Sequence, residues 1–177
     1  MKDSVSDNPN LYLMGFMGTG KSAVGRRVAD HLGMTFLDSD AEIVRSEERT
    51  IEAVFATDGE AYFRRLEREF IEHGHPRTGC VVSCGGGIVT QPGVTERLRQ
   101  RGVVIVLFAS VETILERVSG SRRRPLLNVD DPAARISELL QGRESAYRDA
   151  GCGVSTDNRS IEEVASHVIR VFRERAG

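Results

Sequence analysis

Short apolar runs and amphipathic stretches alternate along the whole chain. A short apolar run predicts a strand, and apolar residues three or four positions apart predict one face of a helix. We expect strands at residues 11–14, 35–37, 80–84, 103–108 and near Val154. We expect helices at residues 21–32, 41–45, 51–73, 94–101, 111–118 and 133–150, and a last one from Ser160. This alternation is typical of a three-layer α/β/α fold with a five-stranded parallel sheet.

Individual residues mark where several helices begin, break or end. Gly33 is expected to cap the first helix, and Gly59 is expected to break the third. Ser160 and Glu163 form a capping box that opens the last helix. The buried face of that helix is expected to consist of Ile161, Val164, Val168 and Phe172. No repeat or linker interrupts the elements, so residues 1–177 are expected to form a single domain with a polar tail at 1–10.

The composition excludes several classes of protein. The chain has 177 residues, of which 40% are hydrophobic and 28% are charged, as in an ordinary globular domain. Its formal net charge of −2 gives no general attraction to nucleic acid or to an anionic membrane. The polar start is not a signal peptide, and the longest apolar run, 103–109, is too short to span a bilayer. We therefore expect a cytoplasmic protein.

The three cysteines do not form a disulfide framework. Cys80, Cys84 and Cys152 are odd in number and are not spaced as metal ligands usually are. Cys80 and Cys84 fall in an apolar run, so we interpret them as small core residues. A metal site on this pair is disfavoured, because no second Cys or His pair is nearby.

The segment GFMGTGKS at residues 15–22 follows the first predicted strand and opens the first predicted helix. It matches the G-x-x-x-x-G-K-S/T phosphate loop in the context that the motif requires. The backbone N–H groups of such a loop and the helix N-terminus bind phosphate oxygens. Lys21 is expected to reach the β- and γ-phosphates, and Ser22 is expected to ligate Mg²⁺. The alternative is a chance glycine-rich turn.

The phosphate loop alone does not say what is done with the nucleotide. The Asn-Lys-x-Asp stretch that selects guanine in switch GTPases is absent, and ATPase motors are usually longer than this chain. A small-molecule kinase fits the size and needs an acceptor site near the γ-phosphate. Ligands of parallel sheets bind at the carboxyl ends of the strands. Three of the predicted strands are followed by glycine-rich or acidic segments, at residues 15–22, 38–40 and 85–87.

Two carboxylates, Asp38 and Asp40, follow the second predicted strand. Residues i and i+2 of an extended segment point to the same side, so the two side chains are expected to project together. Alone they would repel each other, but Mg²⁺ beside one of them changes that balance. One would then hold the metal while the other accepts a hydrogen bond from the attacking hydroxyl. The alternative is that one or both cap the next helix.

Three further features fit an acceptor site less specifically. Arg64 lies beside the apolar face of its predicted helix and could present its fork to a carboxylate, or the helix could simply carry a salt-bridged solvent face. Three glycines at 85–87 permit close approach of the backbone to a ligand. The arginines at 122–124 could lie in a mobile flap over the nucleotide or in a solvated basic loop.

The ordered motifs GFMGTGKS, FLDSDAEI, TDGEAYFRRLE, SCGGGIV and RRRPLL resemble those of the shikimate kinase family over nearly the whole chain. This resemblance implies transfer of the γ-phosphate of ATP to the 3-hydroxyl of shikimate, in the pathway to chorismate and aromatic amino acids. It also implies a P-loop NTPase type of fold with a mobile lid at about 119–131. The partners implied are ATP, shikimate and Mg²⁺, and we expect a monomer that binds neither nucleic acid nor membrane.

The resemblance also implies a role for individual residues. The nucleotide would be bound by Gly18, Thr19, Gly20, Lys21, Ser22, Ala23, Arg117, Arg124 and Arg159. The acceptor would be bound by Asp40, Arg64, Gly85, Gly86, Gly87 and Arg143. Ser22 and Asp38 would hold the metal, and Asp40, Lys21 and Arg124 would be catalytic. Ala23 departs from the Thr of many relatives, and the segment around Arg159 matches the family only loosely.

Two rival functions use the same phosphate loop. A kinase similar to gluconate kinase would also act on an anionic polyol, but it is not expected to carry both FRR and the triple glycine. A nucleotide-dependent regulatory module could bind a partner without turnover. ADP release that depends on a small acceptor would separate a kinase from such a module.

Overall fold

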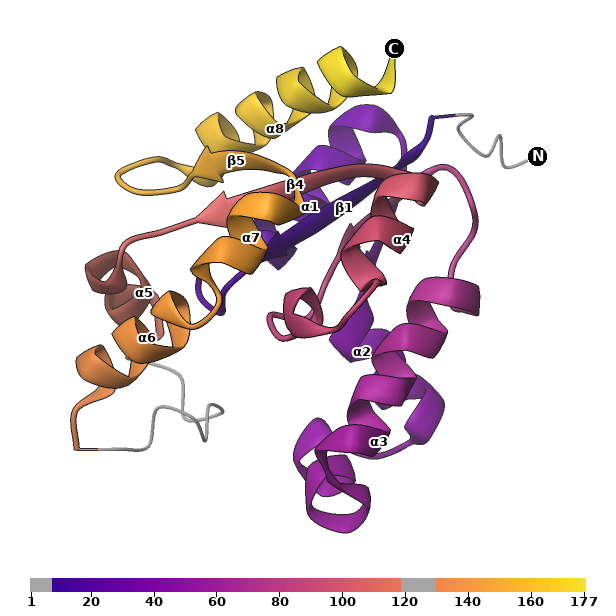
Figure 1. Ribbon diagram of the computed structural model, residues 1–177. Helices are drawn as coiled ribbons and strands as arrows, with labels where there is room; N and C mark the ends of the chain where they lie inside the picture. The colour runs from indigo at the N-terminus through magenta and orange to yellow at the C-terminus, as the bar shows by residue number, and fades with distance from the viewer. Residues whose placement is uncertain (1–7, 119–129) are drawn as a thin grey trace.

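The computed structural model of the protein describes residues 8–118 and 130–177. Five strands form one parallel sheet in the order β2-β3-β1-β4-β5 (Figure 1). They are β1 (Asn10–Gly15), β2 (Thr35–Asp38), β3 (Cys80–Ser83), β4 (Gly102–Phe108) and β5 (Cys152–Ser155). The predicted five-stranded parallel sheet is confirmed.

Helices connect these strands within the described ranges. They are α1 (Lys21–Leu32), α2 (Ser39–Glu47), α3 (Ile51–His73), the 3₁₀ helix η1 (Ile88–Thr90), α4 (Val94–Arg101), α5 (Val111–Val118), α6 (Pro132–Gln141), α7 (Glu144–Ala150) and α8 (Ile161–Ala176). The capping box predicted at the start of α8 is present, because Ser160 and Glu163 bond reciprocally through side chain and backbone. Among these helices, none has the length and apolar character that crossing a membrane requires.

Helices cover both faces of the sheet. Alternate residues of a strand point to opposite faces. Leu11 and Leu13 of β1 pack in an apolar cluster with residues of α1 and α8, whereas Tyr12 and Met14 pack with residues of α4 and α7. Figure 1 shows α8 on one side of the sheet and α4 and α7 on the other. The molecule therefore has the three layers that the sequence predicts.

Helices α2 and α3 pack on each other through a small separate cluster of Ile43, Val54 and Phe63. Figure 1 shows this pair extending below the sheet. Gly59 interrupts α3 with φ 79° and ψ 173°, which confirms the predicted break. Only glycine adopts such a conformation at low cost. The break separates the second half of α3, which carries Arg64, from the first half.

The structure corrects two of the expected helical features. The single helix expected at residues 133–150 is two helices, α6 and α7, because Arg143 leaves helical geometry with φ −120° and ψ −3°. The spacing of hydrophobic residues carries no signal for a change in chain direction at a single residue. Ile161, expected on the buried face of α8, is 53% exposed. Side chains in a first helical turn tilt toward the N-terminus, so this one points past the start of α8.

The cysteines behave as the apolar pattern predicts. Cys80 and Cys84 are each 1% exposed and belong to the apolar cluster around Tyr12. Burial raises the pKa of the Cys84 thiol, so it stays protonated. Cys152 is half-buried, and all three are free thiols. In the described ranges no group of three or more His, Cys, Asp or Glu residues could hold a metal ion.

Candidate active site

The three strand ends singled out in the sequence are neighbours in space. β3 pairs with β1 on one side and with β2 on the other. In this register Ser83 of β3 is the partner of both Leu13 and Asp38. The loops that follow β1, β2 and β3 therefore start from one edge of the sheet. That edge is the carboxyl end of the strands, where parallel sheets bind ligands.

The loop after β1 has the backbone of a phosphate loop. Gly18 and Gly20 have φ of 77° and 91°, a region that favours glycine. A Cβ on Gly15 would lie 2.4 Å from the Leu107 carbonyl oxygen. Lys21 Nζ donates to the carbonyl oxygens of Gly15 at 2.8 Å and Phe16 at 2.9 Å. These bonds place the ammonium group across the mouth of the loop.

The N-terminus of α1 opens on the same loop. Its capping residue is Gly20, which offers no side-chain acceptor to the first N–H groups of the helix. Those groups have no partner within a helix, so they are available to phosphate oxygens. Thr19 is 1% exposed, and its hydroxyl donates to the Phe16 carbonyl at 2.8 Å. Its side chain thus shapes the loop from inside, whereas Ala23 is exposed.

Ser22 and Asp38 meet at the ends of α1 and β2. The Ser22 hydroxyl donates to Asp38 Oδ2 at 2.6 Å and lies 3.3 Å from the Ser83 hydroxyl. The other carboxylate oxygen, Asp38 Oδ1, accepts from the backbone N–H groups of Asp40 at 3.2 Å and Ala41 at 3.3 Å. Asp38 therefore caps α2, which confirms the capping alternative for this residue. A hydroxyl and a carboxylate side by side are the hard oxygen ligands that suit Mg²⁺.

Asp40 occupies a different environment from Asp38. The extended i and i+2 geometry expected for the pair is wrong, because α2 begins at Ser39 and Asp40 lies in its first turn. Asp40 Oδ1 is buried and has no hydrogen-bond partner among the residues that the structure describes. Burial raises the pKa of the Asp40 carboxyl, with a further rise from the charge of Asp38, while Lys21 and Arg64 oppose the shift. A buried carboxylate oxygen without a partner is a natural acceptor for a ligand hydroxyl.

Arg64 reaches this region from α3. Its Nη1 donates to Glu67 Oε2 at 2.7 Å, and its Nη2 and Nε donate to Glu60 Oε1 at 2.9 and 3.2 Å. The two partners differ, because the Glu60 side chain is 66% exposed and that of Glu67 is 1% exposed. Burial raises the pKa of the Glu67 carboxyl, and Arg64 opposes this shift. Arg64 is thus held from the inside by Glu67, and a ligand carboxylate could replace Glu60 on the outside.

The three glycines after β3 have different neighbours. A Cβ on Gly85 would lie 2.7 Å from Glu67 Oε1 and 2.8 Å from Asp40 Oδ1. A Cβ on Gly87 would lie 2.4 Å from Arg64 Nη1. A Cβ on Gly86 would make only ordinary contacts, the nearest at 3.5 Å. Gly85 and Gly87 therefore make room for side chains of the protein itself, whereas Gly86 packs at ordinary contact distance against the phosphate loop and the Tyr147 hydroxyl.

Arg143 and Tyr147 approach Gly86 from the start of α7. Tyr147 donates its hydroxyl to the Gly86 carbonyl at 2.6 Å, and Arg143 Nη1 donates to the same oxygen at 3.3 Å. Arg143 also stacks over the Phe16 ring at 5.8 Å from its centroid. Burial raises the pKa of Tyr147 to about 12. The sequence analysis missed Tyr147, although its position one helical turn after Arg143 was a usable signal.

Two arginines that the resemblance assigns to the nucleotide form hydrogen bonds within the protein. Arg117 donates to the carbonyl oxygen of Gly18 at 3.2 Å and to Thr156 Oγ1 at 2.9 Å, so it joins the phosphate loop to the end of β5. Arg159 donates to the carbonyl oxygens of Ser155 at 3.0 Å and Glu163 at 2.8 Å. Both lie near the loop after β5. Arg124 and the predicted lid at 119–131 fall in or next to residues 119–129, which are outside the described residues.

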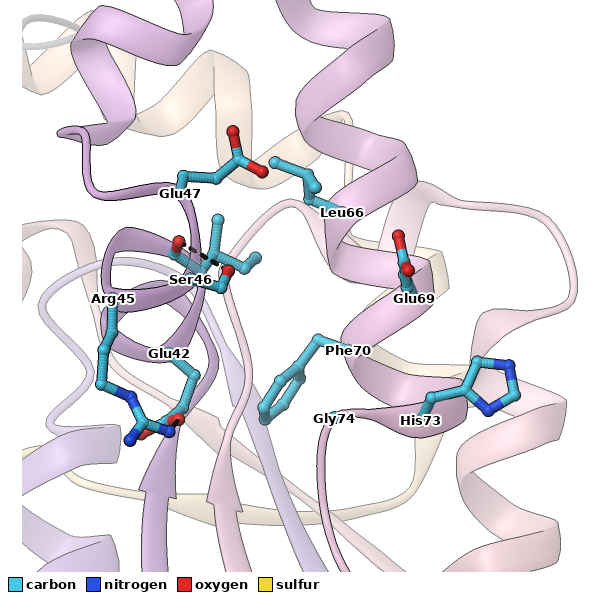
Figure 2. A pocket seen from close by; sticks show the side chains of 10 residues that line it. Glu42, Arg45, Ser46, Glu47, Leu66, Glu69, Phe70, His73 and Gly74 are labelled. Carbon is cyan, nitrogen blue, oxygen red and sulfur yellow. Dashed lines mark hydrogen bonds and ion pairs between the residues drawn. The ribbon is translucent and has the colours of Figure 1, made fainter.

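A hollow in the surface lies apart from these residues. It has a volume of about 610 Å³ and lies between α2 and α3. Figure 2 shows Phe70 and Leu66 of α3 facing Ser46 and Glu47 of α2 across it. None of the predicted site residues that the structure describes lines this hollow. We therefore place the candidate active site at the strand ends and not in this groove.

Comparisons with known proteins agree on one family. The shikimate kinase family profile matches residues 17–173. A shikimate kinase from Caldanaerobacter subterraneus subsp. tengcongensis is 40% identical over 95% of this chain and 98% of its own. The solved structure of shikimate kinase from Acinetobacter baumannii in complex with shikimate is 35% identical, with a TM-score of 0.89 over 98% of both chains. A gluconokinase from Sinorhizobium meliloti, 19% identical over 96% of this chain and 94% of its own with a TM-score of 0.63, shares the fold alone.

Proposed function

The chain belongs to the shikimate kinase family, and we propose that the strand ends described above form its nucleotide site and its acceptor site. The enzyme is an ATP-dependent phosphotransferase that acts on shikimate, in the biosynthesis of aromatic amino acids. The gluconate kinase alternative is disfavoured, because the gluconokinase comparison extends only to the fold. The proposal concerns which residues carry out the transfer of the γ-phosphate to the 3-hydroxyl.

We assign the nucleotide to the loop after β1. Gly18, Gly20 and the N-terminus of α1 present backbone N–H groups to the phosphates, supported by the open cap at Gly20. Lys21 provides positive charge at the γ-phosphate. Thr19 and Ala23 contribute backbone only, since one side chain is turned inward and the other has no polar atom. Arg117 supports the loop from the adenine side, and Arg159 stays a prediction.

We assign Mg²⁺ to Ser22 and Asp38. The Ser22 hydroxyl is 2.6 Å from an Asp38 oxygen, and both atoms are hard ligands. Two protein ligands are few, which fits a magnesium ion that takes its remaining ligands from phosphate and water. When bound, the ion neutralises charge on the phosphoryl oxygens. Asp38 keeps its other oxygen on the helix cap, which fixes the carboxylate in place.

We assign the acceptor to the space bounded by Asp40, Arg64, Arg143 and Gly86, which we call the acceptor site. Arg64 and Arg143 suit the carboxylate of shikimate, because a guanidinium fork pairs with a carboxylate through two N–H groups. Gly86 lies between this space and the phosphate loop, while Gly85 and Gly87 accommodate the side chains around it. Asp40 Oδ1 is the buried acceptor without a partner, and it suits the ligand's hydroxyls.

The transfer is mainly a matter of positioning and electrostatics, because charge spreads over the phosphoryl oxygens in the transition state. Lys21 stabilises that charge, and the predicted lid residue Arg124 would add to it. Asp40 orients the acceptor hydroxyl and takes its proton late, because an alcohol is too weak an acid to lose its proton beforehand. Burial raises the pKa of Asp40, which makes it a stronger base once deprotonated.

One observation carries this proposal. A phosphate loop after β1 and the unpartnered oxygen of Asp40 after β2 lie at the same edge of one sheet, where both strands flank β3. The test is Asp40→Asn, assayed by ADP release with shikimate, quinate, gluconate and nucleoside monophosphates as acceptors. We expect wild type to prefer shikimate and the variant to lose about 10²–10⁴-fold in kcat with its ATP affinity kept. Near wild-type turnover of the variant would exclude Asp40 as the base.

The same assay addresses the rival functions. Acceptor-independent nucleotide binding without turnover would favour a regulatory module, and preference for gluconate would favour the other kinase class. The monomeric state, the cytoplasmic location, the lid and the absence of nucleic-acid or membrane partners stay predictions. Sedimentation of the purified chain with and without ATP and shikimate tests the monomer.

A further inference from the structure

Two buried polar side chains, Gln91 and Glu67, and the half-buried Arg64 form a chain that ends at the acceptor site. Gln91 Nε2 donates to Glu67 Oε2 at 2.6 Å, and the same oxygen accepts from Arg64 Nη1 at 2.7 Å. Gln91 is 7% exposed and Glu67 is 1% exposed. The three residues come from η1's end and from α3, so the amide joins two separate elements. A single carboxylate oxygen thus connects Gln91 to the arginine that we assign to the acceptor.

The Glu67 carboxylate depends on these two donors. Its other oxygen, Oε1, is buried, lies against Gly85 and has no hydrogen-bond partner within residues 8–118 and 130–177. Burial favours the neutral form of a carboxyl, and each charge-assisted hydrogen bond favours the ionised form. A protonated or displaced Glu67 would release Arg64 toward Glu60, its exposed partner. The orientation of the Arg64 fork therefore depends on keeping Glu67 ionised and in place.

The Gln91 side chain is not needed to hold its own loop. The backbone N–H of Gln91 donates to the Ile88 carbonyl at 3.1 Å, and the Gln91 carbonyl accepts from Val94 at 3.3 Å. These bonds survive any change of side chain other than proline. The side-chain oxygen Oε1 has no hydrogen-bond partner, so the amide N–H is the polar group in use. This N–H group forms the hydrogen bond to Glu67.

We propose that Gln91 is a positioning residue for the phosphorylation of shikimate, acting through Glu67 to aim the Arg64 guanidinium at the acceptor carboxylate. The proposal rests on the proposed function, in which Arg64 binds that carboxylate. Gln91 touches neither substrate nor nucleotide in this arrangement. Its removal should weaken acceptor binding and leave the phosphate loop unchanged.

The test compares Gln91→Met with Thr95→Val. Methionine keeps the length and approximate volume of glutamine but has no N–H to donate. Thr95 is 9% exposed and lines the same pocket of about 280 Å³ as Gln91, so its variant controls for a change of packing. We expect Gln91→Met to raise the shikimate KM on the order of tenfold, as loss of one hydrogen bond to a charged group allows. The ATP KM should not change.

A second variant tests the charge on Glu67. Gln91→Glu keeps the size but places a second carboxyl against Glu67, and such a pair must share a proton. Glu67 otherwise faces Arg64 and Glu60 on its own helix and Asp40 from α2. We expect the activity of Gln91→Glu, relative to wild type, to fall as pH rises from about 6 to about 8. A structural role alone would not produce that pH dependence.

A mutant cycle with Glu67→Gln completes the test. If Gln91 acts through Glu67, Gln91→Met should cost nothing further in the Glu67→Gln background. Equal shikimate KM values for wild type, Gln91→Met and Thr95→Val, additive losses in the cycle, or a constant relative activity of Gln91→Glu would each overturn the proposal. An inactive wild type would instead overturn the proposed function, so the two failures are distinguishable.

Discussion

The phosphate loop and the acceptor site lie at neighbouring strand ends but are held by different kinds of contact. The loop is held mainly by local bonds, such as those from Lys21 to Gly15 and Phe16, five or six residues away, with one distant bond from Arg117 to Gly18. The acceptor site is held by bonds between distant elements, including Gln91 to Glu67 and Tyr147 to Gly86, which lies 61 residues away. The conformation of the phosphate loop depends largely on one short segment. The acceptor site forms only when folding brings distant segments together.

The two regions also differ in charge. The phosphate loop concentrates donors, with Lys21 and the N-terminus of α1 facing the phosphates. The acceptor site buries two carboxylate oxygens without partners, one on Asp40 and one on Glu67. Burying such groups costs free energy that the rest of the fold must offset. The acceptor site is therefore the more strained of the two, and its substitutions should affect acceptor kinetics most.

Among the substitutions that compare the two regions, the largest effect on kcat and ATP affinity together should come from breaking the phosphate loop. Lys21→Met removes the positive charge from the transferring phosphoryl group and the bonds to two loop carbonyls. We expect kcat to fall about 10²–10³-fold and ATP affinity to fall with it. Calorimetry should show shikimate binding largely retained, because the acceptor site is built from other contacts. Arg173→Met, an exposed cation in the last turn of α8, is the matched control.

The triple glycine gives a finer test of the acceptor site. Gly85→Ala must displace Asp40 and Glu67, and Gly87→Ala must displace Arg64, whereas Gly86→Ala meets no protein atom closer than 3.5 Å. Overpacking of this kind costs about 1–3 kcal/mol. We expect lower melting temperatures for the first two variants and a wild-type value for the third. Nucleotide affinity, measured by titration with ATP, should be equal in all three.

The kinetics of the three variants should separate the glycines that make room for neighbouring side chains from the glycine beside the acceptor. Gly85→Ala and Gly87→Ala should lower kcat/KM for shikimate by about tenfold or more, through the displaced side chains. Gly86→Ala should also raise the shikimate KM, because the added methyl group would lie between the phosphate loop and the Tyr147 hydroxyl, beside the acceptor site. A Gly86→Ala enzyme with both wild-type stability and a wild-type shikimate KM would contradict the placement of the acceptor.

The same contrast explains what the sequence could predict. The glycine spacing and Lys21 identify a phosphate loop because its bonds are local, and Asp40 and Arg64 follow from the motif order. Glu67 looked like part of a charged solvent face, although it is 1% exposed. Gln91 carried no signal of its own, because its partner lies 24 residues away, and Tyr147 was marked only by its position one helical turn after Arg143. Alternation of apolar runs predicted the sheet, but the change of direction at Arg143 had no periodic signal.

A smaller effect should follow from Tyr147→Phe. This variant removes the hydroxyl bond to the Gly86 carbonyl and keeps the buried ring. A neutral hydrogen bond contributes about 1 kcal/mol, so we expect a few-fold rise in the shikimate KM with an unchanged ATP KM. Tyr62→Phe is the control, because its hydroxyl bonds to Glu47 on the outer side of α3. Equal effects of the two variants would exclude a specific role for the Gly86 contact.

The smallest effect concerns a buried histidine outside both regions. His75 bonds through Nδ1 to the Phe70 carbonyl at 3.1 Å and through Nε2 to the Tyr12 hydroxyl at 2.9 Å. The carbonyl can only accept, so Nδ1 carries the proton and Nε2 accepts from Tyr12. Burial lowers the pKa of the His75 imidazole, which the charge of Arg101 lowers further, although the Phe70 bond opposes the shift. Folding therefore stabilises the neutral ring.

This shift makes stability depend on pH without involving either site. The unfolded chain binds the proton more readily than the folded protein, so the contribution of His75 is complete above about pH 6.5 and is lost as pH falls below it. We expect the melting temperature of wild type to fall between about pH 7.5 and 5.5 by more than that of His75→Gln. The shikimate and ATP KM values of His75→Gln at neutral pH should match those of wild type, because the residue contacts neither the phosphate loop nor the acceptor site. A changed KM for either substrate would show that the two regions are coupled through the sheet and not built independently.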